Sequence, residues 1–385
     1  MTSYDVIVLG LGAMGASATY QLAKRGARVL GIDQYAPPHA KGSSHGETRI
    51  TRLANGESAH YTAFVRRSHE IWRELERETG QTLLTQCGGL FIHGGSDAQV
   101  HVADFFDKTV RNAKKNGVPH ELLDAAEIRR RFAVFDAQAP QQGYFEPDAG
   151  FVRPETCIAT QLRLAQVHGA QVHGGERVLS FEAGPRDVRV STDRGNYCAG
   201  KVIVSLGAWL RDFPGIALKP RLRVLRQVLY WFPLEGSTAD YEPRRFPVFI
   251  WALPNSQTGI YGFPVVDPDR GLKIATEQWT DDGETSTMHA EATDAEIEAM
   301  RGIFATVFPQ ARAGAPATAV CAYTETPDRE FIIDFLPGSH RVVLVSACSG
   351  HGFKHSPAIG EAVAELALLG RTRHDLSPFG LSRFG

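Results

Sequence analysis

A strand, a glycine-rich turn, a helix and a second strand follow one another at the start of the chain, and this pattern constrains the fold more than any other feature. Residues 4–9 (YDVIVL) are apolar and β-branched, as in a buried parallel strand. The glycine-rich segment 10–15 comes next, and a helix is expected over 13–24. A second extended run, 28–33, ends on an acid, Asp33. The pattern predicts a βαβ unit of about thirty residues.

The three glycines of this segment are spaced as G-x-G-x-x-G, the arrangement of a dinucleotide-binding turn. Gly10 permits the tight turn, Gly12 lets the backbone approach a pyrophosphate, and Gly15 lets the helix pack closely on the strand. The free N–H groups of the helix N-terminus then face the phosphates, and Asp33 accepts hydrogen bonds from the ribose of an adenosine. Because the same unit serves NAD, NADP and FAD, it leaves the cofactor open.

A second glycine-bearing turn, near the end of the chain, favours FAD among these cofactors. Residues 342–346 are expected to form a strand, and Ser356-Pro357 predicts a helix over 356–369 with Ser356 as its cap. The loop between them carries Gly350, His351, Gly352 and Lys354. Its N–H donors and basic side chains suit the far end of an extended cofactor, where positive charge stabilises an anionic reduced isoalloxazine. The alternative interpretation is a connector with a solvated lysine.

The middle of the chain has the pattern of a mostly antiparallel sheet. Its alternating or apolar runs are separated by turns and cover residues 186–204, 222–232, 246–253 and 260–263. Three helices are also expected, over 61–79 with Gly80 closing it, and after the two capping boxes Asp124-x-x-Glu127 and Thr293-x-x-Glu296.

Composition and charge exclude several classes of function. The 385 residues carry 41 Lys and Arg against 43 Asp and Glu, a formal net charge of −2, so no positive excess is available to neutralise a nucleic acid. The first residues lack the basic segment of a secretory signal, and the apolar stretch after them is too short to span a bilayer. The five cysteines are dispersed, with no C-x-x-C pair and no metal-ligand spacing. We expect a cytoplasmic protein with free thiols, no metal site, no membrane and no nucleic-acid partner.

These motifs and several others resemble those of the monomeric sarcosine oxidases and their N-methyl-tryptophan oxidase relatives. The resemblance runs through essentially the whole chain, and its further segments are SHGETRITR (44–52), VSLGAW (204–209), YGFP (261–264), CAY (321–323), FIID (331–334) and SGHGFK (349–354). The cysteine-tyrosine segment together with Gly-His-Gly-Phe-Lys is the most specific combination among them.

The resemblance implies FAD as the cofactor, joined through its 8α-carbon to the sulfur of Cys321. Without the resemblance, a lone cysteine is more often a small buried hydrophobe. Cys348, beside the second glycine turn, is a conceivable rival, but it lies outside the cysteine-tyrosine pattern and is interpreted as packing. The residues expected to bind the cofactor are Gly10, Gly12, Gly15, Asp33, Ser43, His45, Thr48, Arg49, Cys321, Gly350, His351, Gly352 and Lys354.

The resemblance also implies a clamp for a substrate carboxylate, formed by Arg52 and Lys354. A planar guanidinium and an ammonium suit an anion in a site closed to water. The alternative for Arg52 is a surface ion pair with Glu57. In the family Tyr261 and Tyr323 would line the substrate side, whereas elsewhere a tyrosine is usually a buried ring with its hydroxyl satisfied.

Lys273 corresponds to the oxygen-activating lysine of that family, on the flavin face opposite the substrate and with Arg49 close by. A fixed cation there stabilises the negative charge that develops on oxygen. The chain departs from the pattern four residues later, where Glu277 stands in place of a histidine. A carboxylate would favour a cationic or amine group there, which leaves the identity of the substrate open. The residues expected to take part in catalysis are Lys273, Arg49, His351, Tyr323 and Glu277, with Glu277 or His351 as acceptor of the amine proton.

The expected fold is α/β: a Rossmann-like FAD-binding domain with an inserted α+β substrate domain built on a mostly antiparallel sheet. The FAD-binding domain is expected to be discontinuous, over residues 1–85, 145–218 and 320–385. The substrate domain takes up 86–144 and 219–319. The flavin is expected at the interface of the two, where pockets commonly form.

The expected activity is that of an FAD-dependent oxidase of secondary N-methyl amino acids. The C–N bond is oxidised to an imine that hydrolyses, and O2 is reduced to H2O2. The substrate amino acid and O2 are the expected partners, and the protein is expected to be a monomer. Three alternatives stay open: a D-amino-acid oxidase or other flavin oxidase or dehydrogenase on the same fold, an NAD(P)-linked enzyme, and a non-catalytic flavin-binding module.

Overall fold

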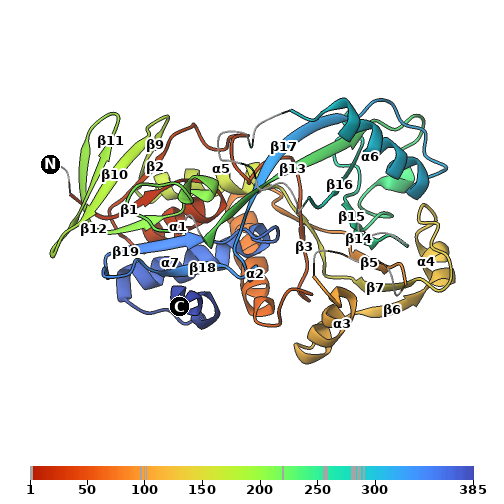
Figure 1. Ribbon diagram of the computed structural model, residues 1–385, viewed down its shortest axis with the longest axis horizontal. Coiled ribbons are helices and arrows are strands. Elements are labelled where there is room, and N and C mark those ends of the chain that lie inside the picture. Colours follow the sequence, from red (N-terminus) through yellow and green to blue (C-terminus); the bar gives the residue numbers. More distant parts are fainter. Residues whose placement is uncertain are drawn as a thin grey trace.

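Two large sheets make up the computed structural model of the chain, the first at the left of Figure 1 and the second at the right. The structure describes residues 3–385 except 96–97, 99, 101, 219–220, 255–258, 279–282, 284–287 and 289–290. A third, three-stranded sheet has the order β3 (Arg49–Thr51), β8 (Gly150–Val152) and β4 (Leu84–Gln86).

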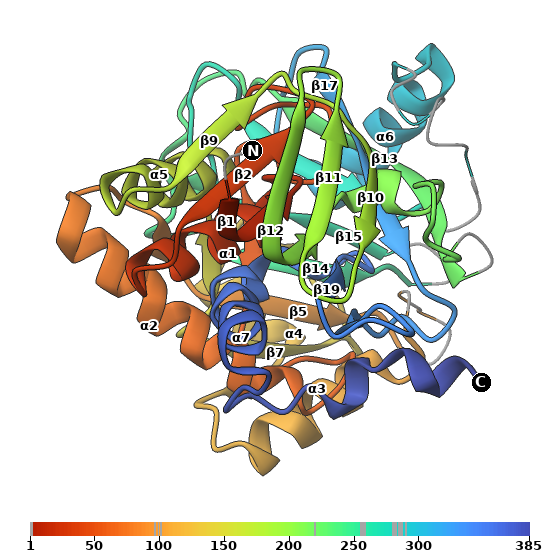
Figure 2. The same cartoon turned by 90° about the vertical axis from the view of Figure 1, so that its left-hand side faces the viewer.

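The first sheet is mixed and has a parallel centre. Its strands are β1 (Ser3–Leu9), β2 (Val29–Asp33), β9 (Gln171–Gly174), β10 (Val178–Ala183), β11 (Val188–Thr192), β12 (Asn196–Val204), β18 (Ile332–Phe335) and β19 (Val342–Ser346). β1 pairs in parallel with β2 and β12, β2 with β9, and β12 with β19. The remaining pairs, β10 with β11, β11 with β12, and β18 with β19, are antiparallel. Figure 2 shows this sheet with β10 and β11 nearest the viewer.

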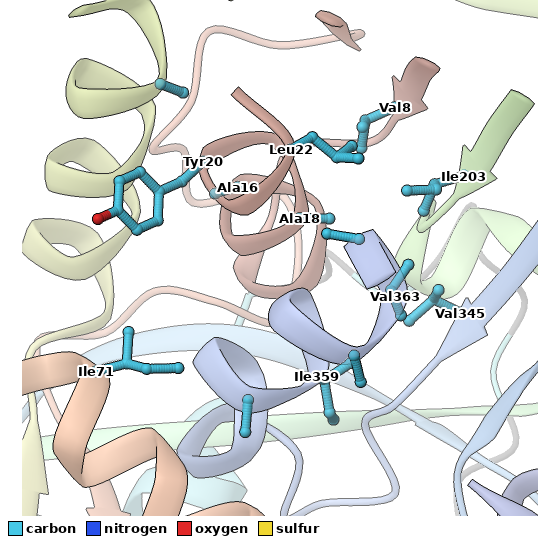
Figure 3. Packing of buried hydrophobic residues seen from close by; sticks show 14 of the residues in the cluster. Val8, Ala16, Ala18, Tyr20, Leu22, Ile71, Ile203, Val345, Ile359 and Val363 are labelled. Carbon is cyan, nitrogen blue, oxygen red and sulfur yellow. The ribbon is translucent and has the colours of Figure 1, made fainter. Parts of the chain in front are cut away.

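Four helices build the main core of the protein with this sheet: α1 (Ala13–Lys24), α2 (Tyr61–Thr79), α5 (Pro154–Val167) and α7 (Ser356–Leu369). α1 packs against both α5 and α7. Figure 3 shows Ala18 of α1 and Val363 of α7 close to Ile203 and Val345 of the sheet. All residues of β2 and β19 are buried, as expected for parallel strands that are covered on both faces.

The second sheet has the order β17-β13-β16-β15-β14-β5-β7-β6, and its neighbouring strands are antiparallel except β14 with β5. Its strands are β5 (Gly89–His93), β6 (Glu121–Asp124), β7 (Gln142–Glu146), β13 (Arg223–Phe232), β14 (Val248–Ala252), β15 (Gly259–Gly262), β16 (Leu272–Thr276) and β17 (Ala317–Glu325). Helices α4 (Ala125–Arg131) and α6 (Asp294–Val307) pack apolar side chains, among them Ile128 and Phe304, into a core with this sheet. α3 (Phe105–Lys115) adds Ala113 to a smaller cluster with Phe91 and Tyr144.

Most of the expected local elements are confirmed. Helices over 13–24, 61–79 and 356–369 have the predicted bounds, and the left-handed Gly80 ends α2. Thr293 and Glu296 form the complete capping box at the start of α6. At the start of α4, the Asp124 side chain accepts a hydrogen bond from the N–H of Glu127.

Two expectations are wrong. Ser356 does not cap α7, because the 3-10 turn η4 (Phe353–His355) leads directly into the helix and the N-cap, His355, already has helical φ and ψ. The run 186–204 does not share a sheet with the other three runs. Its strands β11 and β12 are antiparallel to each other, as expected, but the apolar end of β12 pairs with β1 and β19 of the first sheet, within the segment 145–218 expected for the FAD-binding domain. In addition, β7 and β17 cross the expected domain boundaries at 144/145 and 319/320.

Among the described helices, none is both long and apolar enough to cross a membrane.

The crossing of α1 and α7 tolerates no added atom at Gly360. A Cβ on Gly360 would lie 2.4 Å from the Ser17 Cβ, whereas a Cβ on Gly302 of α6 would meet no atom within 4 Å. We expect Gly360→Ala to lower the free energy of unfolding by about 1–3 kcal/mol through overpacking. Gly302→Ala is the matched control and is expected to raise it by about 0.5–1 kcal/mol, since alanine has the better helix propensity. Denaturant unfolding of both variants checks this, and an equal gain in both would contradict the close packing of the two helices.

Candidate active site

A cavity of about 540 Å³ lies where the first sheet faces the second. Its walls include most of the site residues predicted from the sequence: Gly10, Gly12, Asp33, Ser43, Arg49, Arg52, Tyr261, Glu277, Tyr323, Gly350, His351, Gly352 and Lys354. Five other predicted residues do not line it: Gly15, His45, Thr48, Lys273 and Cys321. The two glycine-bearing turns, far apart in the sequence, therefore line one cavity.

The first glycine turn brings bare backbone to the cavity. Gly10 has a φ of +85°, and a Cβ on Gly15 would lie 1.8 Å from the Gly10 oxygen, so neither position accepts a side chain. Gly12 is the N-cap of α1 and has no side chain, while the N–H of Ala13 donates a hydrogen bond to the Ser44 hydroxyl (3.3 Å). The start of α1 thus offers N–H groups and the positive end of its dipole to an anion in the cavity.

Asp33 is the last residue of β2, and its carboxylate binds the backbone of the first glycine turn and of the loop after β2. Its Oδ2 accepts a hydrogen bond from the N–H of Leu11 (2.8 Å), and its Oδ1 accepts one from the N–H of Tyr35 (2.9 Å). Asp33 Oδ1 also lies 3.3 Å from Nε2 of His39, which lines the cavity as well. His39 was not predicted, because a histidine in a polar loop carries no pattern that marks it.

The second glycine turn carries a buried lysine. Lys354 is 3% exposed, and its Nζ donates a hydrogen bond to the carbonyl of His351 (2.7 Å). Burial lowers the pKa of the Lys354 ammonium to about 7, with Arg52 lowering it further and the carboxylates of Glu57 and Glu277 opposing the shift. The lysine is therefore not the solvated connector residue of the alternative interpretation.

Arg52 follows β3 and is buried at the wall, with 3% of its surface exposed. Its guanidinium forms a bidentate ion pair with Glu57 (Nη2 to Oε1, 2.7 Å) and donates to Oδ1 of Asn55 (3.0 Å). The rings of Phe91 and Phe105 lie 5.4 and 5.1 Å from the guanidinium carbon. The ion pair that the sequence left as an alternative is thus present, but it is buried and belongs to the cavity wall.

Lys273 and Glu277 occupy the same face of β16 and its continuation, because side chains two and four residues apart in a strand point the same way. Four residues of extended chain separate them by about 13 Å. Glu277 lines the cavity, whereas the Nζ of Lys273 donates to the carbonyls of Gly46 (2.6 Å) and Thr48 (2.9 Å) and lies 3.1 Å from the Thr48 hydroxyl. Burial, and then Arg49, hold the pKa of Lys273 well below its usual range.

Thr48 and His45 lie near Lys273 and do not line the cavity. The carbonyl of Thr48 accepts hydrogen bonds from Lys273 and from Nη1 of Arg49 (2.8 Å). His45 is buried, and burial lowers its pKa to about 4. Ser43 does line the cavity, and its hydroxyl donates to the carbonyl of Ala322 (2.5 Å).

Cys321 is buried on the same sheet face, in a cluster with Leu229, Trp231 and Ala275. Burial raises the pKa of its thiol, while the charges of Arg49 and Lys273 oppose that shift. Cys348 contributes to the cavity wall, and burial raises its thiol pKa as well. The part of the chain that the structure describes contains no group of three or more His, Cys, Asp or Glu side chains placed to hold a metal ion.

Two tyrosines close the cavity on the side of the second sheet. Tyr323, on β17, is buried, and Tyr261, on β15, is half-buried. Their hydroxyls are hydrogen-bonded to each other, and burial raises the pKa of both phenols, so both are neutral at physiological pH.

Comparison with known proteins agrees with this arrangement. The family described as FAD dependent oxidoreductase matches residues 5–366. The chain is 38% identical to the monomeric sarcosine oxidase of Streptomyces avermitilis over 98% of its own length and 97% of that protein, and 34% identical to the N-methyl-L-tryptophan oxidase of Salmonella heidelberg over 99% of both. It superposes on the open form of NikD, an unusual amino acid oxidase essential for nikkomycin biosynthesis, with a TM-score of 0.84 at 25% identity over 99% of this chain and 98% of that one.

The chain is thus an FAD-dependent oxidoreductase. Within that class it belongs to the family of monomeric sarcosine oxidase and N-methyl-L-tryptophan oxidase. The fold itself is more widespread, since glycine oxidase from Geobacillus kaustophilus has a TM-score of 0.79 at 20% identity.

The buried pair of Arg52 and Lys354 predicts pH-dependent binding of a simple anion. Lys354 is protonated below pH 7 and neutral above it, and an anion beside it favours the protonated form. The Kd for acetate is therefore expected to rise above pH 7, by up to about tenfold per pH unit, until the pKa of the complex is reached. Calorimetric titration between pH 6 and 9 measures this, and Lys354→Met is expected to bind acetate more weakly and without this slope. A constant Kd in the unaltered protein would contradict the assigned pKa.

Proposed function

We propose that the protein is an FAD-dependent oxidase of secondary N-methyl amino acids. It would oxidise the C–N bond to an imine that hydrolyses, with reduction of O2 to H2O2. One observation supports this most directly: the buried cations Arg52 and Lys354 line the same cavity as the two glycine turns. A carboxylate can therefore be bound next to the place where a dinucleotide would lie. Relatives named for oxidation of sarcosine and N-methyl-L-tryptophan support the same substrate class.

The residues present fit FAD. The start of α1, with Gly12 at its N-cap and the positive end of its dipole at the cavity, suits the pyrophosphate, and Asp33 suits the adenosine ribose. Gly350, Gly352 and Ser43 would hold the other end of the cofactor, with Lys354 and His351 supplying positive character beside it. When bound, FAD accepts the two electrons of the amine and passes them to O2.

Arg52 and Lys354 would hold the substrate carboxylate, and in doing so they would orient the amine and the adjacent C–H bond. Tyr261 and Tyr323, whose neutral hydroxyls share one hydrogen bond, would leave one hydroxyl proton to donate on the opposite wall. The amine has to be neutral for its lone pair to assist the reaction, so a nearby acceptor for its proton is useful. Glu277, which lines the cavity near Lys354, and His351 are our candidates for that acceptor.

Glu277 also bears on the choice of substrate. It stands where the resemblance would place a histidine, and a carboxylate attracts a cationic or amine group instead of donating to an anion. We therefore propose a secondary amino acid other than sarcosine as the preferred substrate.

Lys273 and Arg49 would serve the reaction with O2. The strand spacing puts Lys273 about 13 Å from Glu277, so its charge would act on the side away from the bound amino acid. A buried cation held by fixed carbonyl groups is preorganised to stabilise negative charge that develops on oxygen.

We further propose that the FAD-binding domain comprises 1–85, 145–218 and 320–385, that 86–144 and 219–319 form the substrate domain, and that the protein acts as a cytoplasmic monomer. All five cysteines are free thiols in the structure, which suits a reducing compartment. Strands β7 and β17, which pair within the second sheet, cross two of the proposed boundaries.

Peroxide formation tests the proposed reaction. We expect the protein to release one H2O2 per amine oxidised from a panel of N-methyl amino acids, with no need for NAD, because O2 would be its electron acceptor. Primary D-amino acids and a dye or quinone acceptor are included to detect the main alternatives. Activity only with the dye, or only with primary D-amino acids, would reject the proposal in favour of those alternatives.

The covalent bond is tested by mass spectrometry of the denatured protein. The proposed link between Cys321 and FAD predicts a mass increase equal to FAD that is lost in Cys321→Ser. Cys348→Ser is the matched control, because Cys348, unlike Cys321, lines the cavity. Retention of the added mass in Cys321→Ser, or its loss only in Cys348→Ser, would contradict the assignment.

A further inference from the structure

Two carboxylates bind the backbone of one short segment of the cavity wall, one at each end of the segment; we call these ends pinned. Residues 46–54, which contain β3, run antiparallel to residues 146–155, which contain β8. The β-pairing in the middle joins Arg49 to Val152 and Thr51 to Gly150. At each end of this paired stretch, a glutamate of the second segment accepts hydrogen bonds from two consecutive backbone N–H groups of the first.

Glu146 pins the end that carries Arg52. It is fully buried, and its two oxygens accept from the N–H of Leu53 (2.6 Å) and the N–H of Ala54 (3.1 Å). The hydroxyl of Tyr144 donates to the same carboxylate (2.9 Å). The two pinned N–H groups follow directly after Arg52, so the carboxylate sets where the backbone behind the guanidinium lies.

Glu155 pins the end that receives Lys273. Its Oε1 accepts from the N–H of Gly46 (2.6 Å) and from the N–H of Glu47 (3.1 Å). Both of these residues have positive φ, +92° and +72°, so this turn is one that a non-glycine chain adopts only under restraint. The carbonyl of Gly46 in turn accepts a hydrogen bond from Nζ of Lys273.

We propose that Glu146 and Glu155 are positioning residues that act on different halves of the reaction. Glu146 acts through Arg52 on binding of the substrate carboxylate, and Glu155 acts through Gly46 and Lys273 on the reaction with O2. The proposal rests on the proposed function, because it takes the roles of Arg52 and Lys273 from there. The strand β3 and its pairing with β8 lie between the two pinned ends, so a change at one end need not disturb the other.

The test compares Glu146→Gln, Glu155→Gln and a matched control, Glu76→Gln. Glu76 makes the same kind of contact, since its Oε1 accepts from the N–H groups of Leu83 and Leu84 (both 2.8 Å), and it does not line the cavity. Glutamine keeps the shape and one acceptor oxygen but removes the charge that strengthens these bonds. At Glu146, where both oxygens accept, it also replaces one acceptor by an NH2 donor. Each variant is studied as the FAD-loaded protein, by calorimetric binding of acetate, by anaerobic reduction with substrate, and by reoxidation with O2.

We expect Glu146→Gln to weaken acetate binding and raise the KM for the substrate by about tenfold, with reoxidation within about twofold of the unaltered protein. Glu155→Gln is expected to slow reoxidation by about tenfold and to leave acetate binding within about twofold. Glu76→Gln is expected to change neither. Equal losses in both measurements for either variant, or losses no larger than those of Glu76→Gln, would overturn the proposal.

Two reference variants keep this outcome separate from a failure of the proposed function. Arg52→Gln has to weaken acetate binding and Lys273→Met has to slow reoxidation; if either does not, the proposed role of that residue is wrong, and the positioning role built on it is wrong as well. If both behave as expected while the glutamate variants do not, only the present inference fails.

Amide hydrogen exchange of the unaltered protein provides a measurement that does not depend on any variant folding. Acetate is expected to increase the protection of the Leu53 and Ala54 amides and to leave that of Gly46 and Glu47 unchanged. Equal protection at both ends would show that the segment responds as one unit and would overturn the proposal.

Discussion

Helix α1 starts immediately after strand β1, and the turn that joins them leaves no room for a β-carbon. A Cβ on Gly15 would lie 1.8 Å from the Gly10 oxygen, and one on Gly10 would lie 2.5 Å from the Ser205 oxygen. This contact between backbone atoms brings the start of α1 to the cavity and presents α1 to α5 and α7. Helix α7 packs on α1 and directly follows the second glycine turn, so the position of α1 also affects where that turn and Lys354 lie. The rest of the site is built on this contact.

Two buried cations at the site, Arg52 and Lys273, have compensating partners. Arg52 is paired with Glu57, and Lys273 has three oxygen atoms of the 46–48 turn around its amino group. Such compensation matters because an isolated charge in a low-dielectric interior is costly. The period of two residues in a strand keeps Lys273 and Glu277 on one sheet face while separating them along it, so these two ionisable groups do not neutralise each other.

The sequence predicted those parts of the site that lie within short continuous segments. The first glycine turn and Asp33 could be recognised because thirty neighbouring residues carry the whole pattern. The capping box at Thr293 could be recognised for the same reason. By contrast, Glu146 and Glu155 were not singled out. A glutamate in FEP, or in the first turn of a helix such as α5, has the pattern of a solvated residue, and its backbone partners lie about a hundred positions earlier in the chain.

The amino-acid sequence by itself determined the periodic elements, the two glycine turns, the balance of charge and the family to which the chain belongs, because each of these depends on residues that are close together in the chain or on the sequence as a whole. Only the tertiary structure decided which segments meet. It assigned the run 186–204 to the first sheet, brought Arg52 to Lys354 in one cavity, and set residues 46–54 against 146–155. Pairing between distant strands and contacts between distant side chains depend on topology and on the packing of the whole molecule, and no local pattern of residues encodes them.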